Sequence, residues 1–201
     1  MSSGGRASIA FIDLRSHQYK ALTIACPDPR EPAISHDGRT LAFVSREEVY
    51  VSDGRSSRKL GSRTPARNPA FVPGDKDLVY VAGELPRSQI LQIDLATGEN
   101  EVLVDDTTEL AGPSISPDRS RLVYTSRRTG NWQVWIKDLA THRDVEVTKG
   151  RCNSLAPAWD LDSSEIVFSS DCNRGLNLPA LFRMPVVHSF ATAMPGTFHV
   201  R

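Results

Sequence analysis

The stretch "PSISPDRSRLVYTS" (residues 113–126) decides the fold, because its skeleton occurs four times along the chain. Each copy has a proline, a polar turn that contains Asp, and an apolar triplet that begins nine residues after the proline. The prolines are 37, 44 and 44 residues apart. A period of this size is typical of stacked supersecondary repeats. The other three copies are "PAISHDGRTLAFVS" (residues 32–45), "PAFVPGDKDLVYVA" (residues 69–82) and "PAWDLDSSEIVFSS" (residues 157–170).

A second motif follows each copy. It is clearest in "ILQIDLATGENEVLV" (residues 90–104) and "VWIKDLATHRDVEVT" (residues 134–148), and a further copy, "IAFIDLRSHQYKALT" (residues 9–23), opens the chain. Short runs of β-branched and aromatic residues alternate with turn residues, which predicts four strands in each unit. No 3.6-residue apolar period is sustained, so we expect an all-β chain.

The turn between the first and second strands of a unit carries Asp37, Asp118 or Asp162 in three copies. An Asp side chain can accept hydrogen bonds from nearby backbone N–H groups and hold a tight turn. We therefore predict a structural role for these three carboxylates. The second copy has Pro-Gly-Asp here, a turn of different chemistry.

Four-stranded units of 40 to 45 residues have the size of propeller blades. The "P-x-[IFW]-S-P-D" start and the "DL-x-T-G" middle resemble the TolB-type, WD-repeat-like β-propeller family. The resemblance covers residues 8–187 and implies antiparallel four-stranded blades around a common axis. It places a half blade at 8–25 and blades at 31–62, 68–105, 112–149 and 156–187, between a disordered segment at 1–7 and a tail or last strand at 188–201.

The ring predicted in this way is incomplete, because the first unit has only its third and fourth strands. The tail at 188–201 can supply at most one more strand. An open ring exposes two apolar blade flanks, which opposes stability. We expect the chain to be a C-terminal part of a larger propeller. A tight ring of about five blades and a flank covered by a partner are the alternatives.

The propeller resemblance also bears on the cysteines. It puts the loops that hold Cys152 and Cys172 at one end of the same blade, so a disulfide between them is expected. Such a bond indicates an oxidising compartment. The alternative is two unpaired loop cysteines, and Cys26 is expected to be free.

The loops between second and third strands carry the most distinctive side chains, and Arg and Trp are enriched at binding hot spots. Alternatively, Trp132 packs under its own blade and the two arginines are solvated. The candidate binding residues are Arg127, Arg128, Asn131, Trp132, Asn173 and Arg174.

Composition and motifs exclude several classes of function. Lys plus Arg equals Asp plus Glu at 24 each, which disfavours nucleic-acid binding. The sequence has no apolar run long enough to insert into a membrane. We expect no metal site and no cofactor, because no His or Cys pair has ligand spacing and no phosphate loop is present. Asp105, Asp106 and Glu109 predict a solvated acidic loop; a weak calcium site is the alternative, but the ligand spacing of known calcium loops is absent.

The sequence therefore predicts a non-catalytic scaffold that binds a protein partner. The resemblance implies an interaction module of the bacterial cell envelope, with an extracytoplasmic location; a cytoplasmic one stays open. One alternative is the gating propeller of a prolyl-oligopeptidase-like serine peptidase, which needs a hydrolase domain that is not seen after residue 187. The other is the sensory propeller of a membrane-bound regulator.

Overall fold

A computed structural model describes residues 8–22, 24, 26–172 and 179–186. The expected disordered segment at 1–7 and the tail at 188–201 lie outside these ranges. Within them the chain forms strands and no helix, so no helix is present that could cross a membrane. The strands are β1 (Ala10–Ile12), β2 (Tyr19–Ala21), β3 (Arg30–Ile34), β4 (Leu41–Ser45), β5 (Glu48–Ser52), β6 (Ser57–Lys59), β7 (Ala66–Phe71), β8 (Asp77–Ala82), β9 (Ser88–Asp94), β10 (Asn100–Asp106), β11 (Leu110–Ile115), β12 (Arg121–Thr129), β13 (Asn131–Asp138), β14 (Asp144–Glu146), β15 (Ser154–Trp159), β16 (Glu165–Ser170) and β17 (Ala180–Pro185).

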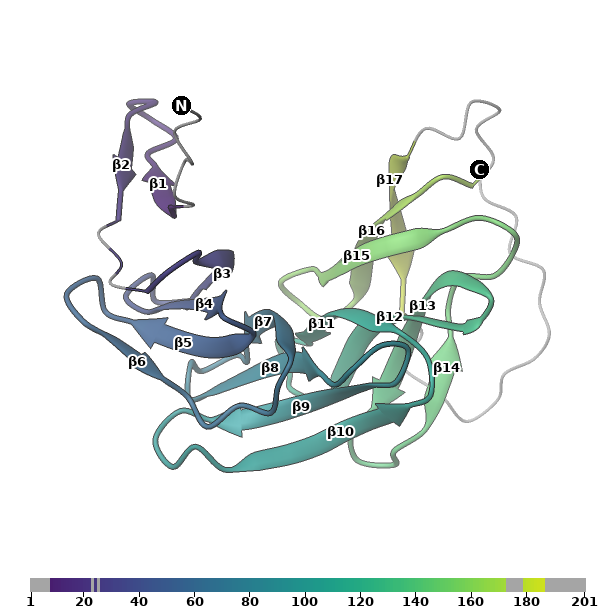
Figure 1. Cartoon of the computed structure of the whole chain (residues 1–201). Helices are drawn as coiled ribbons and strands as arrows, with labels where there is room; N and C mark the ends of the chain where they lie inside the picture. The colour runs from purple at the N-terminus through teal and green to yellow at the C-terminus, as the bar shows by residue number, and fades with distance from the viewer. Residues whose placement is uncertain (1–7, 23, 25, 173–178, 187–201) are drawn as a thin grey trace, which may run out of the picture.

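The strands form antiparallel sheets in which each strand pairs with the next along the chain. β3–β6, β7–β10 and β11–β14 are four-stranded, β1–β2 is a hairpin, and β15–β17 is a sheet of three described strands. The first strands of neighbouring sheets contact one another: β3 with β7, β7 with β11 and β11 with β15. The sheets follow one another in an arc whose two ends do not meet (Figure 1). The predicted open propeller of antiparallel blades is thus confirmed.

The prolines of the repeated skeleton lie in β-bulges of the four first strands. In each bulge, two paired residues of the first strand are three positions apart, whereas their partners in the second strand are two positions apart. In β7, Arg67 pairs with Val81 and Ala70 pairs with Val79. Proline lacks the N–H that a ladder needs, so a bulge accommodates it. The residue before each proline has a positive φ of 51° to 57°: Glu31, Asn68, Gly112 and Ala156.

The apolar triplets build the contacts between blades, because their side chains alternate across the sheet. In β8, Leu78 and Tyr80 pack against the preceding blade, whereas Val79 packs against the following one. Leu122, Val123 and Tyr124 of β12 repeat this arrangement one blade later. Each pair of neighbouring blades therefore shares its own apolar core.

Meander topology gives the propeller two different ends. The turns between first and second strands and between third and fourth strands lie at one end, here called the turn face. The connections between blades and the turns between second and third strands lie at the other end, here called the loop face. The described candidate binding residues, Arg127, Arg128, Asn131 and Trp132, belong to the loop face.

Candidate functional site

On the turn face, the predicted aspartates hold their own turns. The Asp37 carboxylate accepts hydrogen bonds from the Ser35 hydroxyl (2.7 Å) and the Arg39 N–H (2.9 Å), and these bonds lower its pKa. Asp118 accepts from the Ser116 hydroxyl at 2.6 Å. Asp162 accepts the Ser164 N–H at 3.0 Å. These contacts give the three carboxylates the geometry of turn residues.

Asp118 has the largest resolved perturbation of the three. Burial opposes ionisation of its carboxylate, but hydrogen bonds from Ser116 and Ser120 and the charge of Arg121 outweigh burial and lower the pKa to about 2. The ionised carboxylate is therefore the form that fits this turn.

The same turns also join neighbouring blades, which the sequence did not predict. The N–H groups of His36 and Asp37 donate to the Asp75 carboxylate at 2.9 and 3.1 Å. The N–H of Asp118 donates to the Ser163 hydroxyl at 3.0 Å. Asp75 and Ser163 occupy the same position of the repeat, six residues after the proline, and both have positive φ. A common backbone geometry thus presents different side chains to the preceding blade.

On the loop face, Arg127 and Trp132 lie at the two ends of the turn between β12 and β13. The Arg127 guanidinium is 5.8 Å from the centre of the Trp132 ring and 3.7 Å from the Glu109 carboxylate. Arg127 is exposed and Trp132 is half-buried. The pair therefore offers a cation and an aromatic surface to solvent at one place.

Arg128 has a different environment, although it is adjacent in sequence. Its guanidinium donates to the Asp106 carboxylate at 2.8 Å and to the Tyr124 hydroxyl at 2.9 Å. It also lies 4.3 Å from the centre of the Trp135 ring. Tyr124 is buried, which raises its pKa, and its hydroxyl donates to Asp144 at 2.8 Å. Arg128 therefore connects β10, β12, β13 and β14.

The connection between the third and fourth blades supports the Trp132 turn. The Asn131 side chain donates to the Gly150 carbonyl at 3.3 Å, and the Trp132 N–H donates to the Asn153 side chain at 3.2 Å. Cys152 and Cys172 are joined by a disulfide with a Cα–Cα distance of 5.1 Å, within the range that such a bond spans. Asn173 and Arg174, the last two candidate residues, lie outside the described residues.

The acidic loop is paired rather than simply solvated. Asp105 lies 3.3 Å from Arg87, Asp106 lies 2.8 Å from Arg128, and Glu109 lies 3.7 Å from Arg127. Arg87 comes from the turn between β8 and β9, and Arg127 and Arg128 come from the last part of β12. Within the described ranges no group of three or more His, Cys, Asp or Glu side chains could hold a metal ion.

A cavity of about 440 Å³ opens between the four bulges near the propeller axis. Among the described residues that line it, Glu31 alone is ionisable, and its carboxylate accepts hydrogen bonds from the backbone and side-chain N–H groups of Asn68. The Asn68 side chain in turn accepts the Gly112 N–H at 3.3 Å. The four prolines were the sequence signal for this opening, but the sequence predicted them only as the starts of strands.

Arg67 in β7 is half-buried, and its guanidinium donates to the Gly83 carbonyl at 3.0 Å and to the Ser88 hydroxyl at 2.7 Å. Burial lowers the pKa of Arg67, and the nearby carboxylates Glu109 and Glu31 act in the opposite direction. Glu31 lines the opening, whereas Glu109 pairs with Arg127.

The repeats, the bulges and the four-stranded blades match a known family. A model described as the TolB beta propeller domain covers residues 47–195. The chain belongs to the TolB β-propeller family. Over 75 residues it is 37% identical to the Tol-Pal system protein TolB of Acinetobacter baylyi. This alignment covers 37% of the present chain and 16% of the relative. Over 139 residues it is 26% identical to a protein TolB homolog of Chlorobaculum tepidum. This second alignment covers 66% of the present chain and 31% of the relative.

The chain thus spans less than a third of the length of these TolB relatives. Among solved structures, putative TolB from Agrobacterium tumefaciens matches with a TM-score of 0.78 and 17% identity, over 89% of this chain and 70% of that one. Enzymes share the fold as well. Oligogalacturonate lyase has a TM-score of 0.66 and a puromycin-hydrolysing peptidase of Mycobacterium tuberculosis has 0.57, at 19% and 14% identity. At such identities the likeness shows the fold alone.

Proposed function

We propose that this TolB-family chain is a non-catalytic scaffold that binds a protein partner on its loop face. The observation that carries the proposal is the Arg127–Trp132 pair, a guanidinium over an aromatic ring on an exposed turn. Arg and Trp are the side chains most enriched at interface hot spots. A turn that is held by Asn153 and a nearby disulfide loses little conformational entropy on binding.

Arg127 and Arg128 have different roles in this proposal. Arg127 is exposed, and its pairing with Glu109 at 3.7 Å is easily exchanged for a carboxylate of a partner. Arg128 is held by Asp106, Tyr124 and Trp135, so its role is to position the turn. Asn131, next to Trp132, contributes polar contacts at the rim of the surface.

The partner that we propose is a protein of the bacterial cell envelope. Support comes from the relative in Acinetobacter baylyi, which is named for the Tol-Pal system. A disulfide in the supporting loop favours an extracytoplasmic compartment, since reducing compartments rarely maintain such bonds. The gating propeller of a peptidase has weaker support, because the likeness to the peptidase is one of fold alone.

Site-specific crosslinking tests the proposal. A photoreactive benzoylphenylalanine at position 131 places the crosslinker beside Trp132, and the same group at Leu161, an exposed turn-face position, is the matched control. Both proteins are exported to the periplasm of a bacterium that has a Tol-Pal system. We expect position 131 to give a discrete crosslinked envelope protein, and Trp132→Ala or Arg127→Ala to reduce its yield at least fivefold. Equal yields from positions 131 and 161 would refute a binding role for the loop face.

A further inference from the structure

The connection between β14 and β15 brings two cations to the turn that carries Trp132. The Gly150 carbonyl in this connection accepts a hydrogen bond from the Asn131 side chain at 3.3 Å. Lys149 and Arg151 flank Gly150 in the chain, and both are exposed. Each of them is therefore one residue away from a backbone group that contacts the neighbour of Trp132.

This connection is fixed before any partner binds. Gln133 is only 1% exposed, and its side chain donates to the Gly150 and Cys152 carbonyls at 3.2 and 2.9 Å. The same side chain accepts the Thr148 hydroxyl at 2.7 Å. Cys152 is in turn joined to Cys172 by the disulfide. The two cations thus stand on a backbone that is already ordered, which lowers the entropy cost of binding.

The exposed charges around this turn are cations. Lys149 and Arg151 form no ion pair within the part of the chain that the structure describes. The Arg127 side chain is 52% exposed, whereas the Glu109 side chain that pairs with it is 31% exposed. The surface beside Trp132 therefore presents positive charge to an approaching molecule. Other carboxylates of the region already have hydrogen-bond or ion-pair partners in the chain: Asp106, Asp144, Glu146 and Asp171.

A local surface of this kind can select a partner even though the chain as a whole has no net charge. Given the protein-binding role proposed above, on which this assignment rests, we propose that the surface recognises an acidic, extended segment of the partner. An apolar side chain of the segment lies on the Trp132 ring. Carboxylates before and after it pair with Arg127 and with Lys149 or Arg151. Opposite charges steer the encounter and fix the register of the segment.

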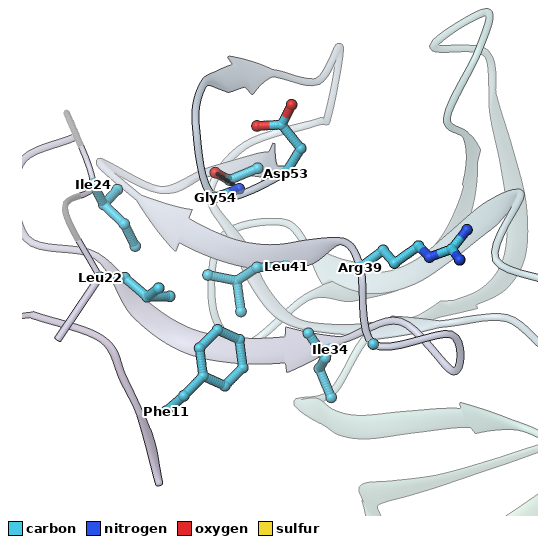
Figure 2. A pocket seen from close by; sticks show the side chains of 10 residues that line it. Phe11, Leu22, Ile24, Ile34, Arg39, Leu41, Asp53 and Gly54 are labelled. Atoms are coloured by element: carbon cyan, nitrogen blue, oxygen red, sulfur yellow. Dashed lines mark hydrogen bonds between the residues drawn. The ribbon is translucent and has the colours of Figure 1, made fainter. Parts of the chain in front are cut away.

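The turn face supplies a matched control. Arg39 and Arg55 are exposed cations in the two turns of the blade β3–β6. Arg39 lies at the edge of a largely apolar cavity of about 140 Å³, and its guanidinium extends away from Phe11 and Leu22, which line that cavity (Figure 2). Reversal of these two charges therefore changes the net charge as much as reversal at Lys149 and Arg151, without a change on the loop face.

A short acidic peptide is the probe. A fluorescein-labelled peptide EDEELDEDE is titrated with the full 201-residue chain and followed by fluorescence anisotropy, and the neutral peptide QNQQLNQNQ is its control. We expect saturable binding of the acidic peptide, at least about tenfold tighter than that of the neutral one. Because salt screens exposed charges, an increase from about 50 to about 300 mM NaCl should weaken this binding about fivefold.

Protein variants decide where the peptide binds. Lys149→Glu combined with Arg151→Glu should weaken binding at least about tenfold while circular dichroism stays unchanged, and Arg39→Glu combined with Arg55→Glu should weaken it less than about twofold. The proposal is overturned if both double variants weaken binding equally, or if the acidic peptide binds no better than the neutral one. It is also overturned if vesicles of phosphatidylglycerol bind through Lys149 and Arg151 and the peptide does not displace them.

Crosslinking from position 131 separates this proposal from the binding role itself. We expect the Lys149→Glu, Arg151→Glu variant to reduce the yield of the crosslinked envelope protein at least about fivefold. If the yield depends on Trp132 but not on these two charges, the loop face binds a partner and only the acidic chemistry is wrong. If positions 131 and 161 give equal yields, the binding role fails, and the acidic segment fails with it.

Discussion

Replacement of Arg128 by alanine should destabilise the chain by about 3 kcal/mol, although its neighbour Arg127 can be replaced at almost no cost. The Asp106 carboxylate that pairs with Arg128 is only 9% exposed, and Arg128 itself is 25% exposed. Removal of the guanidinium leaves a nearly buried carboxylate without its cation. The Tyr124 hydroxyl and the Trp135 ring lose the same partner.

The magnitude follows from three contributions. Loss of one partner of a buried ion pair costs about 3–5 kcal/mol. Part of this loss is recovered here, because Thr108 and Ser126 still hydrogen-bond to Asp106 and solvent reaches the site. The cation–π contact with Trp135 adds about 0.5–2 kcal/mol. A net loss of about 3 kcal/mol lowers the folding equilibrium constant more than a hundredfold.

Urea unfolding monitored by tryptophan fluorescence measures this loss. With an m value of about 2 kcal/mol per molar, the midpoint should fall by about 1.5 M. Arg127→Ala is the control, because its exposed pair with Glu109 should contribute less than about 0.5 kcal/mol. In a double-mutant cycle, Arg128→Ala and Asp106→Asn should couple by about 1–3 kcal/mol. If Arg128→Ala costs no more than Arg127→Ala, the positioning role assigned to Arg128 is wrong.

Three further predictions concern other parts of the molecule. Free-thiol titration of unfolded, unreduced protein from an oxidising compartment should find one thiol, Cys26, and a count of three thiols would contradict the disulfide. Reduction of the bond between Cys152 and Cys172 should lower the free energy of unfolding, measured in urea, by about 3 kcal/mol. The lowered pKa of Asp118 stabilises the fold above about pH 4, and this contribution is lost as the pH falls towards 2. Because the side chain is 47% exposed, Asp118→Asn should cost only about 1 kcal/mol at pH 6 and about a third of that at pH 2.5, and an equal loss at both pH values would contradict it. Gly112→Ala should cost about 1 kcal/mol through its positive φ, and unchanged thermal stability would argue against that strain.

The sequence predicted the blades because their determinants are local and repeated. Alternating apolar residues such as Leu122, Val123 and Tyr124 must face opposite sides of a strand, and turn residues separate one strand from the next. Four copies of one skeleton also exclude most other topologies. The strand count at the start of the chain was sufficient to predict an open ring.

The bulges could not be derived in this way. A proline in a strand signals an edge, a strand start or a bulge, and one sequence does not choose among them. The residues before the prolines, Glu31, Asn68, Gly112 and Ala156, have no common chemistry. Only the backbone reveals their common positive φ and the axial opening that they line.

The candidate site was predicted by residue type and only partly by environment. Arg127 and Arg128 are the same amino acid in adjacent positions, but they lie in an irregularity of the β12–β13 pairing and have different surroundings. The partners that distinguish them are Asp106, at the end of β10 in the preceding blade, and Glu109, in the connection between β10 and β11. Contacts between blades depend on how the sheets are stacked, and composition or spacing within one repeat does not specify them.

Contacts between turns give each junction of the propeller its own chemistry. Asp75 accepts backbone N–H groups of the preceding blade, Ser163 accepts one with its hydroxyl, and Arg119 lies 3.5 Å from the Asp77 carboxylate of the preceding blade. Asp75, Arg119 and Ser163 occupy the same position of the repeat. If two blades exchanged places, an arginine would lie against a backbone N–H group, or a carboxylate would lose its partner. Similar blades with interchangeable apolar flanks could otherwise stack in several orders. Polar contacts at the turn face therefore favour one order of blades, while the apolar cores supply most of the stability.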